Sequence, residues 1–190
     1  MRKRREGLTF YEKKQIVSRE LVMEILSWLF YTVITVLIAW LLVWGFGFRI
    51  HMVGSAMLPD IRPGQSVFID RVLYHLRQPS RGDLVAFYPN GNENAHIMIR
   101  RVVALPGETV RIEDGILYID DRPEGDSGRH YDRIADAGIA VNSITLGNKE
   151  YFVLGDLRNA SEDSRSAGIG PVTSAMLVGK AWFWVGDDDK

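Results

Sequence analysis

Cysteine is absent from the 190-residue sequence, which excludes disulfide bonds, thiol catalysis and cysteine-ligated metals. The four histidines are scattered along the chain without ligand-like spacing, so we expect neither a metal site nor a cofactor. Internal repeats and low-complexity segments are also missing. Apolar residues make up 46% of the chain and charged residues 25%, a composition typical of a folded protein rather than a disordered one.

The net charge is small, −1 at pH 7, but it is unevenly distributed. Residues 1–20 contain seven Lys or Arg and three Asp or Glu, a balance of +4 that leaves −5 for the rest of the chain. Basic residues ahead of an apolar segment follow the topology rule of membrane proteins. They therefore require no nucleic-acid partner, and we expect none.

The longest uncharged run covers residues 25–48 and is rich in Leu, Val, Ile, Trp and Phe. As a helix it would be about 36 Å long, enough to cross a hydrocarbon core of ~30 Å. The basic residues before it place the N-terminus in the cytoplasm and everything after Arg49 outside. The sequence thus predicts a single-pass protein of the cytoplasmic membrane: a basic cytoplasmic segment (1–24), a transmembrane signal-anchor (25–48) that contacts the lipid bilayer, and an extracytoplasmic domain (49–190).

Two other interpretations of the apolar run are weaker. A cleavable signal peptide has a shorter apolar core and small residues at its exit, whereas residues 43–48 here are mostly bulky. A buried core helix would need a polar face, and Ser27, Thr32 and Thr35 are too few to make one. An uncleaved anchor is therefore favoured.

Beyond residue 48 the helical period disappears and short apolar or alternating runs follow, separated by turn-forming clusters such as Asp114-Gly115. The expected strands cover residues 49–53, 66–72, 83–88, 96–104, 109–113, 116–119, 151–154 and 176–184. This spacing favours a mainly β fold with an antiparallel sheet. Residues 119–147 are more polar and loosely patterned, which predicts a small cap or insertion on the main sheet.

Three sequence blocks stand out behind the apolar run. Residues 53–59 read Val-Gly-Ser-Ala-Met-Leu-Pro, and residues 99–107 read Ile-Arg-Arg-Val-Val-Ala-Leu-Pro-Gly. Residues 155–165 read Gly-Asp-Leu-Arg-Asn-Ala-Ser-Glu-Asp-Ser-Arg. Together these blocks resemble those of the bacterial type I signal peptidases of the Gram-positive type, which the family writes as G-x-S-M-x-P, K-R-V-x-G-x-P-G-D and G-D-N-R-x-N-S-x-D-S-R. The resemblance implies a single-pass membrane protein with an all-β catalytic domain.

In that family a serine–lysine dyad performs peptide hydrolysis, and the resemblance places the serine position on Ala56 and the lysine position on Arg100. Ala56 has no hydroxyl to activate. Arg100 stays protonated, since the pKa of a guanidinium exceeds ~12. Ser55 is the nearest alternative nucleophile, but it would point to the opposite face of an extended segment. It would also lack a base, because His96 would lie about 13 Å from Arg100 along a strand. We therefore expect no intact dyad.

The shell around the dyad is better preserved. By resemblance, Ser161 orients the base and Asp156, Arg158, Asp163 and Arg165 form a charged structural network. Arg101 is the expected partner of one of the aspartates, Ser55 flanks the nucleophile position, and Arg100 is a candidate partner for Asp163 or Asp156. An extended peptide would pair with residues 51–55 and 83–87. The expected peptide-binding residues are Val53, Met57, Leu58, Pro59 and Val85.

These features predict a membrane-anchored protein that binds or assembles exported proteins without cutting them. By resemblance to inactive relatives, its partners would be secreted preproteins or pilin subunits, possibly with a sortase. The alternative is a working signal peptidase seen as an inactivated variant or using an unrecognised nucleophile. A third option is a regulator that captures signal peptides.

Overall fold

The computed structural model describes residues 18–46, 48–124 and 131–186. The chain divides into two compact units, residues 1–41 and residues 42–190. Most of the predicted cytoplasmic segment, residues 1–17, lies outside the described residues.

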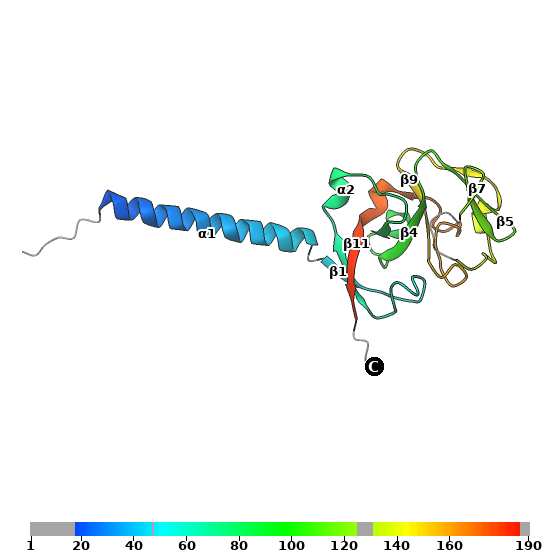
Figure 1. The fold of residues 1–190 in the computed structure, drawn as a ribbon, viewed down its shortest axis with the longest axis horizontal. Helices are drawn as coiled ribbons and strands as arrows, with labels where there is room; N and C mark the ends of the chain where they lie inside the picture. The colour runs from blue at the N-terminus through cyan, green and yellow to red at the C-terminus, as the bar shows by residue number, and fades with distance from the viewer. Residues whose placement is uncertain (1–17, 47, 125–130, 187–190) are drawn as a thin grey trace, which may run out of the picture. The chain divides into compact units, whose positions relative to one another are not determined.

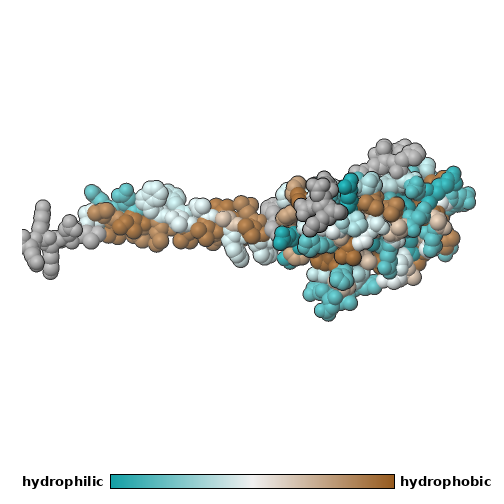
Figure 2. All heavy atoms as spheres, turned by 90° about the horizontal axis from the view of Figure 1, so that it is seen from below, coloured by the Kyte–Doolittle hydropathy of each residue, from teal (hydrophilic) through white to brown (hydrophobic). Residues whose placement is uncertain are grey.

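One long helix, α1 (Arg19–Phe46), contains almost all of the predicted anchor. It begins six residues before the uncharged run, where the Oγ of Ser18 accepts a hydrogen bond from the backbone N–H of Leu21 at 3.3 Å and caps the helix. The run was predicted to extend to Phe48, which instead begins a strand. The most apolar window of α1 has a mean hydropathy of 2.2 and no buried residue, and Figure 2 shows hydrophobic residues along much of its length. By length and composition, α1 can cross a membrane.

The rest of the described chain is mainly β (Figure 1). Its strands are β1 (Phe48–His51), β2 (Ser66–Asp70), β3 (Leu84–Phe87), β4 (Met98–Ala104), β5 (Thr109–Glu113), β6 (Ile116–Ile119), β7 (Arg122–Pro123), β8 (Ile144–Thr145), β9 (Glu150–Leu154), β10 (Val172–Thr173) and β11 (Leu177–Val185). Short helices complete the set: α2 (Leu73–Leu76), η1 (Pro89–Gly91), η2 (Gly138–Val141) and η3 (Ser174–Met176). Each of the eight predicted segments overlaps a strand.

The strands form two antiparallel sheets. The larger has seven strands in the order β1-β2-β11-β3-β4-β9-β10, and the smaller has four in the order β7-β6-β5-β8. Every pairing is antiparallel, which confirms the predicted fold class. The segment predicted as a cap, residues 119–147, supplies β7, η2 and β8, and it shares its sheet with β5 and β6.

Two tight turns build the smaller sheet. Asp114 and Gly115 connect β5 to β6 with φ angles of 51° and 75°. Asp120 and Asp121 connect β6 to β7 with φ angles of 48° and 61°. Positive φ at both central residues defines the type I′ turn, whose twist matches that of the paired strands. The Asp-Gly pair is thus a local sequence signal that fixes the register of β5 against β6.

Three apolar clusters hold the β unit together. The first joins β1, β2, β3, β4 and β11 to the segment between β1 and β2, and it includes Met57, Ile61 and Ile99. The second lies between the two sheets, where Ala140 and Leu146 pack with Phe152 and Leu154. The third lies along β3, β4, β9 and β10. The first cluster positions the segment that holds Ala56.

Candidate functional site

Ala56 lies in a turn rather than in an extended strand. The backbone N–H of Leu58 donates to the carbonyl of Ser55 at 3.0 Å, and that of Ile61 donates to the carbonyl of Met57 at 2.9 Å. The expectation that Ser55 and Ala56 point to opposite faces of a strand is therefore wrong, because these hydrogen bonds coil the segment. Ala56 and Met57 are buried, Ser55 and Leu58 are half-buried, and Pro59 is exposed.

Arg100 lies on β4 and is only 6% exposed. Its Nε donates to the main-chain carbonyl of Glu162 at 2.8 Å, and its Nη1 donates to the carbonyl of Ile99 at 2.7 Å. Burial lowers the pKa of Arg100, and the negative charges of Asp163 and Glu162 oppose that shift. The guanidinium is thus held by two neutral carbonyls rather than by a carboxylate.

Indirect contacts connect Ala56 to the Arg100 site. The carbonyl of Ala56 accepts a hydrogen bond from the N–H of Leu157 at 3.0 Å. A Cβ on Gly155 would lie 2.8 Å from that carbonyl oxygen and 2.4 Å from the Cβ of Ser161. Ser161 immediately precedes Glu162, whose carbonyl binds Arg100. The structure therefore brings the three sequence blocks together.

Arg101, the next residue of β4, is paired with acidic side chains. Its Nε and Nη2 donate to the two carboxylate oxygens of Asp156 at 2.7 and 2.5 Å. Its Nη2 also donates to Asp60 at 2.8 Å, and its Nη1 to the carbonyl of Gly82 at 2.9 Å. Burial lowers the pKa of Arg101, but the hydrogen bond to Asp156 outweighs it and the net pKa is raised.

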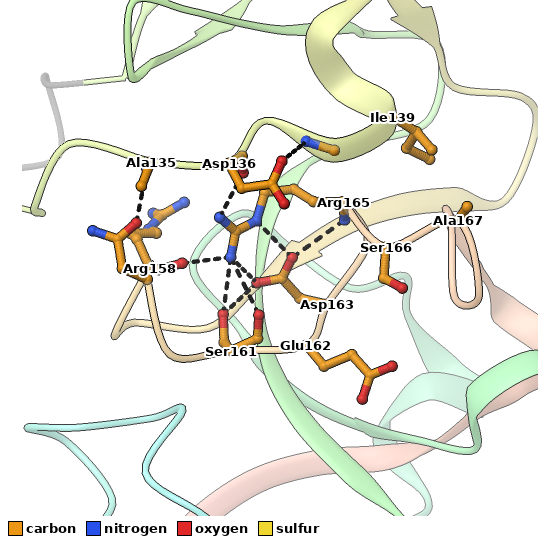
Figure 3. A pocket seen from close by; sticks show the side chains of 12 residues that line it. Ala135, Asp136, Ile139, Arg158, Ser161, Glu162, Asp163, Arg165, Ser166 and Ala167 are labelled. Carbon is orange, nitrogen blue, oxygen red and sulfur yellow. Dashed lines mark hydrogen bonds and ion pairs between the residues drawn. The ribbon is translucent and has the colours of Figure 1, made fainter.

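Asp163 is the centre of a second buried network (Figure 3). Arg165 donates from Nε and Nη2 to its two carboxylate oxygens at 2.8 and 2.9 Å. The hydroxyl of Ser161 donates to Asp163 at 2.5 Å, and the N–H of Gly155 donates to it at 3.1 Å. Burial raises the pKa of Asp163, yet these hydrogen bonds outweigh it and the net pKa is lowered. Ser161 thus contacts Asp163 and Arg165, and no hydrogen bond joins its side chain to Arg100.

Arg158 is almost completely buried. Its Nη2 donates to Glu124 at 2.9 Å, and its guanidinium lies 4.0 Å from the centre of the Tyr131 ring. Its Nε and Nη1 have no hydrogen-bond partner among the residues that the structure describes. Arg158, Ser161, Asp163 and Arg165 line a cavity of about 490 Å³ together with residues near Asp136. Arg158, Ser161, Asp163 and Arg165 all belong to the loop whose Glu162 carbonyl binds Arg100.

The predicted peptide-binding edge is only partly free. Val85 lies in β3, which pairs with β4 on one side and β11 on the other, so the expectation that residues 83–87 offer an open edge is wrong. β1 pairs only with β2 among the described strands, and Val53 beyond it is exposed. β4 extends past the end of β9, because the last pair of these strands is Arg101 with Leu154.

The direction of the backbone groups shows which residues of β4 face its unpaired side, beyond the end of β9. The N–H of Val102 donates to the carbonyl of Asp83, and its own carbonyl accepts from Gly82, so Val102 faces the β3 side. Successive residues of a strand direct their backbone groups to alternate sides, so Ile99 faces the opposite side, beyond the end of β9. On that side, the carbonyl of Ile99 accepts a hydrogen bond from the Nη1 of Arg100.

Sequence reasoning missed the contacts that three residues make in this site. Glu162 acts through its main-chain carbonyl, Asp60 extends the Arg101–Asp156 pair, and Gly155 permits a close approach of two loops. Asp60 was noticeable as an acidic residue in the first block, but nothing in the sequence marks a carbonyl as a ligand. The proposed pairing of Arg100 with Asp163 or Asp156 is not found, because Arg165 and Arg101 occupy those carboxylates.

Comparisons with known proteins identify the family of this chain. The profile of the family described as "Signal peptidase, peptidase S26" matches residues 24–185. The chain belongs to the signal peptidase family. It is 30% identical to signal peptidase I T of Bacillus subtilis over 165 residues, which covers 83% of each chain. It is also 30% identical to signal peptidase I S of Bacillus subtilis over 182 residues, 90% of this chain and 93% of the relative.

A third relative, probable signal peptidase I-1 of Synechocystis, is 30% identical over 139 residues and covers 70% of this chain and 68% of its own. The crystal structure of a signal peptidase I from Enterococcus faecalis is 28% identical, with a TM-score of 0.40, and covers 56% of this chain and 98% of that one. Like bacterial signal peptidases, this family member has an N-terminal apolar helix ahead of a β unit.

Proposed function

We propose that this signal peptidase family member binds exported proteins without cleaving them. The observation that supports this proposal is the bonding of Arg100. A general base must be deprotonated and free to accept a proton, whereas the protonated Arg100 donates from two nitrogens to fixed carbonyls. Ala56 supplies no hydroxyl. Ser55 is half-buried, and among the described residues no hydrogen bond joins its side chain to a group that could act as a base.

We further propose that the protein is anchored by α1 with its N-terminus in the cytoplasm and residues 49–190 outside. The basic residues before α1 support this orientation. A β unit outside the membrane would meet chains as they are exported. Its partners would be secreted preproteins or pilin subunits, with a sortase as a further candidate. Crosslinking in cells from an exposed position such as Val53, followed by identification of the captured chain, distinguishes among these three.

A cleavage assay tests the inactive state. The full chain in detergent would be compared with its Ala56→Ser/Arg100→Lys double variant on one preprotein substrate. We expect cleavage only by the double variant, because serine and lysine restore both members of the dyad. Each protein must show the same near-UV circular dichroism, so that a silent sample is known to be folded.

The competing function, a working peptidase, predicts that the unaltered chain also cuts the preprotein. In that case Ser55→Ala identifies the nucleophile if it stops the reaction. If neither the unaltered chain nor the folded double variant cuts, preprotein binding must be measured directly, and its absence would contradict the proposed function.

A further inference from the structure

Arg100 is a buried cation without an ion-pair partner among the described residues. Its side chain forms no contact within ion-pair distance of a carboxylate among the described residues, and the buried Asp156 and Asp163 are paired with Arg101 and Arg165. Glu162 and Asp163 influence Arg100 only through longer-range electrostatic attraction, and Glu162 is exposed to solvent. A buried charge that lacks a partner is costly, and such groups are normally paired.

Two of the three guanidinium nitrogens of Arg100 are already fixed. Nε is bound to the carbonyl of Glu162 and Nη1 to that of Ile99. Nη2 donates to none of the described residues, and it is not among the buried atoms that lack a partner, so it reaches solvent. Because a guanidinium is planar and its hydrogens point in fixed directions, the first two bonds hold Nη2 in one orientation.

The guanidinium lies at the side of β4 that is left unpaired beyond the end of β9. Residues 98–100 extend beyond the last pair of β4 with β9, and the backbone groups of Ile99 face that unpaired side. Ala56 and Ile99 belong to the same buried apolar cluster, which gives the site an apolar wall. An extended peptide adding to such an edge meets the backbone of Ile99, whose carbonyl already accepts from Arg100, and beside it the guanidinium.

We infer that this site takes a carboxylate on an extended peptide, with Arg100 as the group that binds it. This inference rests on the proposed binding function and specifies its ligand. A carboxylate supplies the missing counter-charge and accepts a charge-assisted hydrogen bond from Nη2. The carboxylate belongs either to the C-terminus of the peptide or to an Asp or Glu side chain within it.

Fluorescence anisotropy with the full chain in detergent tests the inference. The probe is one labelled peptide rich in alanine and valine, made in three forms: with a free C-terminal carboxylate, as the C-terminal amide, and as the amide with one internal Glu. We expect a carboxylate form to bind at least about tenfold more tightly than the plain amide. Preference for the first form assigns the chain terminus as the source, and preference for the third assigns an acidic side chain.

Two variants identify the group responsible. Arg100→Gln should remove the difference between the carboxylate and amide forms. Arg122→Gln, on the exposed β7 of the smaller sheet, should leave the difference unchanged and so controls for net charge. Near-UV circular dichroism checks that each variant is folded.

The outcomes separate this inference from the proposed function. If the unaltered chain binds all three peptides equally, the peptide-binding function stands and the carboxylate inference is overturned. It is also overturned if Arg100→Gln retains the full difference. If the unaltered chain binds neither these peptides nor a preprotein, the proposed function and the inference fail together.

Discussion

At Gly155 the loop after β9 approaches the Ala56 turn closely. A Cβ at this position would lie 2.4 Å from the Cβ of Ser161 and 2.8 Å from the carbonyl oxygen of Ala56. Gly155→Ala should therefore lower the free energy of unfolding by roughly 1–3 kcal/mol, because one wall of the site must move. Gly168→Ala is the matched control: its Cβ would meet only the Oγ of Ser166, at 3.6 Å. Urea unfolding of both variants measures the difference, and equal losses would contradict this account.

Asp163 makes stability depend on pH. Hydrogen bonds from Arg165 and Ser161 overcome the effect of burial and lower its pKa in the folded state. Its stabilising contribution is therefore fully present above the unfolded-state pKa of about 3.9 and is lost as pH falls through the lower folded-state value. The free energy of unfolding should rise with pH in that acidic window, and Asp163→Asn should flatten the rise.

The same substitution should also cost about 3 kcal/mol at neutral pH, because Arg165 stays buried without its counter-charge. Chemical denaturation between about pH 3 and pH 7 measures both effects. The lower limit is roughly one unit below the ordinary pKa of an Asp carboxyl, and the upper limit is the neutral reference. Asp132→Asn, at an exposed position, is the control and should leave the pH profile unchanged. If the free energy of unfolding of Asp163→Asn rises with pH as steeply as that of the unaltered chain, the pH dependence belongs to another carboxylate. Asp83 is the first alternative, because the hydrogen bond from Lys180 lowers its pKa against the effect of burial.

At the level of elements, the two type I′ turns of the smaller sheet differ in one residue. The first has glycine at its second central position, whereas the second has Asp121 at a φ of 61°. Asp121→Gly should raise the free energy of unfolding by about 0.5 kcal/mol, because glycine adopts positive φ without steric cost. The contact it removes, Arg111 with Asp121 at 3.6 Å, involves a side chain that is 93% exposed and so contributes little.

Gly115→Ala at the equivalent position of the first turn should act in the opposite direction. Its φ is 75°, and a Cβ would lie 3.1 Å from the carbonyl oxygen of Ile134. Thermal unfolding of the two variants beside the unaltered chain compares them directly. A loss of stability in Asp121→Gly would show that the Arg111 contact outweighs the backbone effect.

The success of sequence analysis differed among the elements for physical reasons. The longer strands can be predicted from their residue patterns. In β2 and β5, buried residues alternate with half-buried or exposed ones, and Asp114-Gly115 fixes the turn between β5 and β6. The two-residue strands β7, β8 and β10 carry no period and exist only through their partners. The separation of β5 and β6 into a second sheet depends on long-range packing around Ala140 and Phe152, which no local pattern encodes.

The same distinction applies within the site. Charged residues in a recognised block, such as Arg101 and Asp156, are visible in the sequence, and the structure joins them. The coil around Ala56 was missed because its signal is a set of backbone hydrogen bonds. The bonding of Arg100 was missed for a related reason: its partners are main-chain carbonyls, which every residue possesses.

For the whole molecule, the orientation of α1 determines which partners the β unit can meet. The helix has the length and hydropathy of a membrane span, and seven Lys or Arg lie within residues 1–20. Protease added to intact protoplasts should therefore degrade residues 49–190 and spare an N-terminal epitope tag. Protection of the β unit together with digestion of the tag in intact protoplasts would reverse the proposed topology.

Charge reversal tests the cause of that orientation. Replacing Arg2, Lys3, Arg4 and Arg5 by glutamate removes four positive charges from the first twenty residues and leaves α1 intact. Because Lys and Arg near the ends of a span set its orientation while acidic residues contribute little, a fraction of the variant should insert with the β unit inside and become resistant to external protease. A matched variant with the same four residues changed to glutamine should show a similar fraction, since loss of positive charge is the operative change. Unchanged digestion in both would mean that Lys13, Lys14 and Arg19, which are closer to the span, suffice to retain the N-terminus.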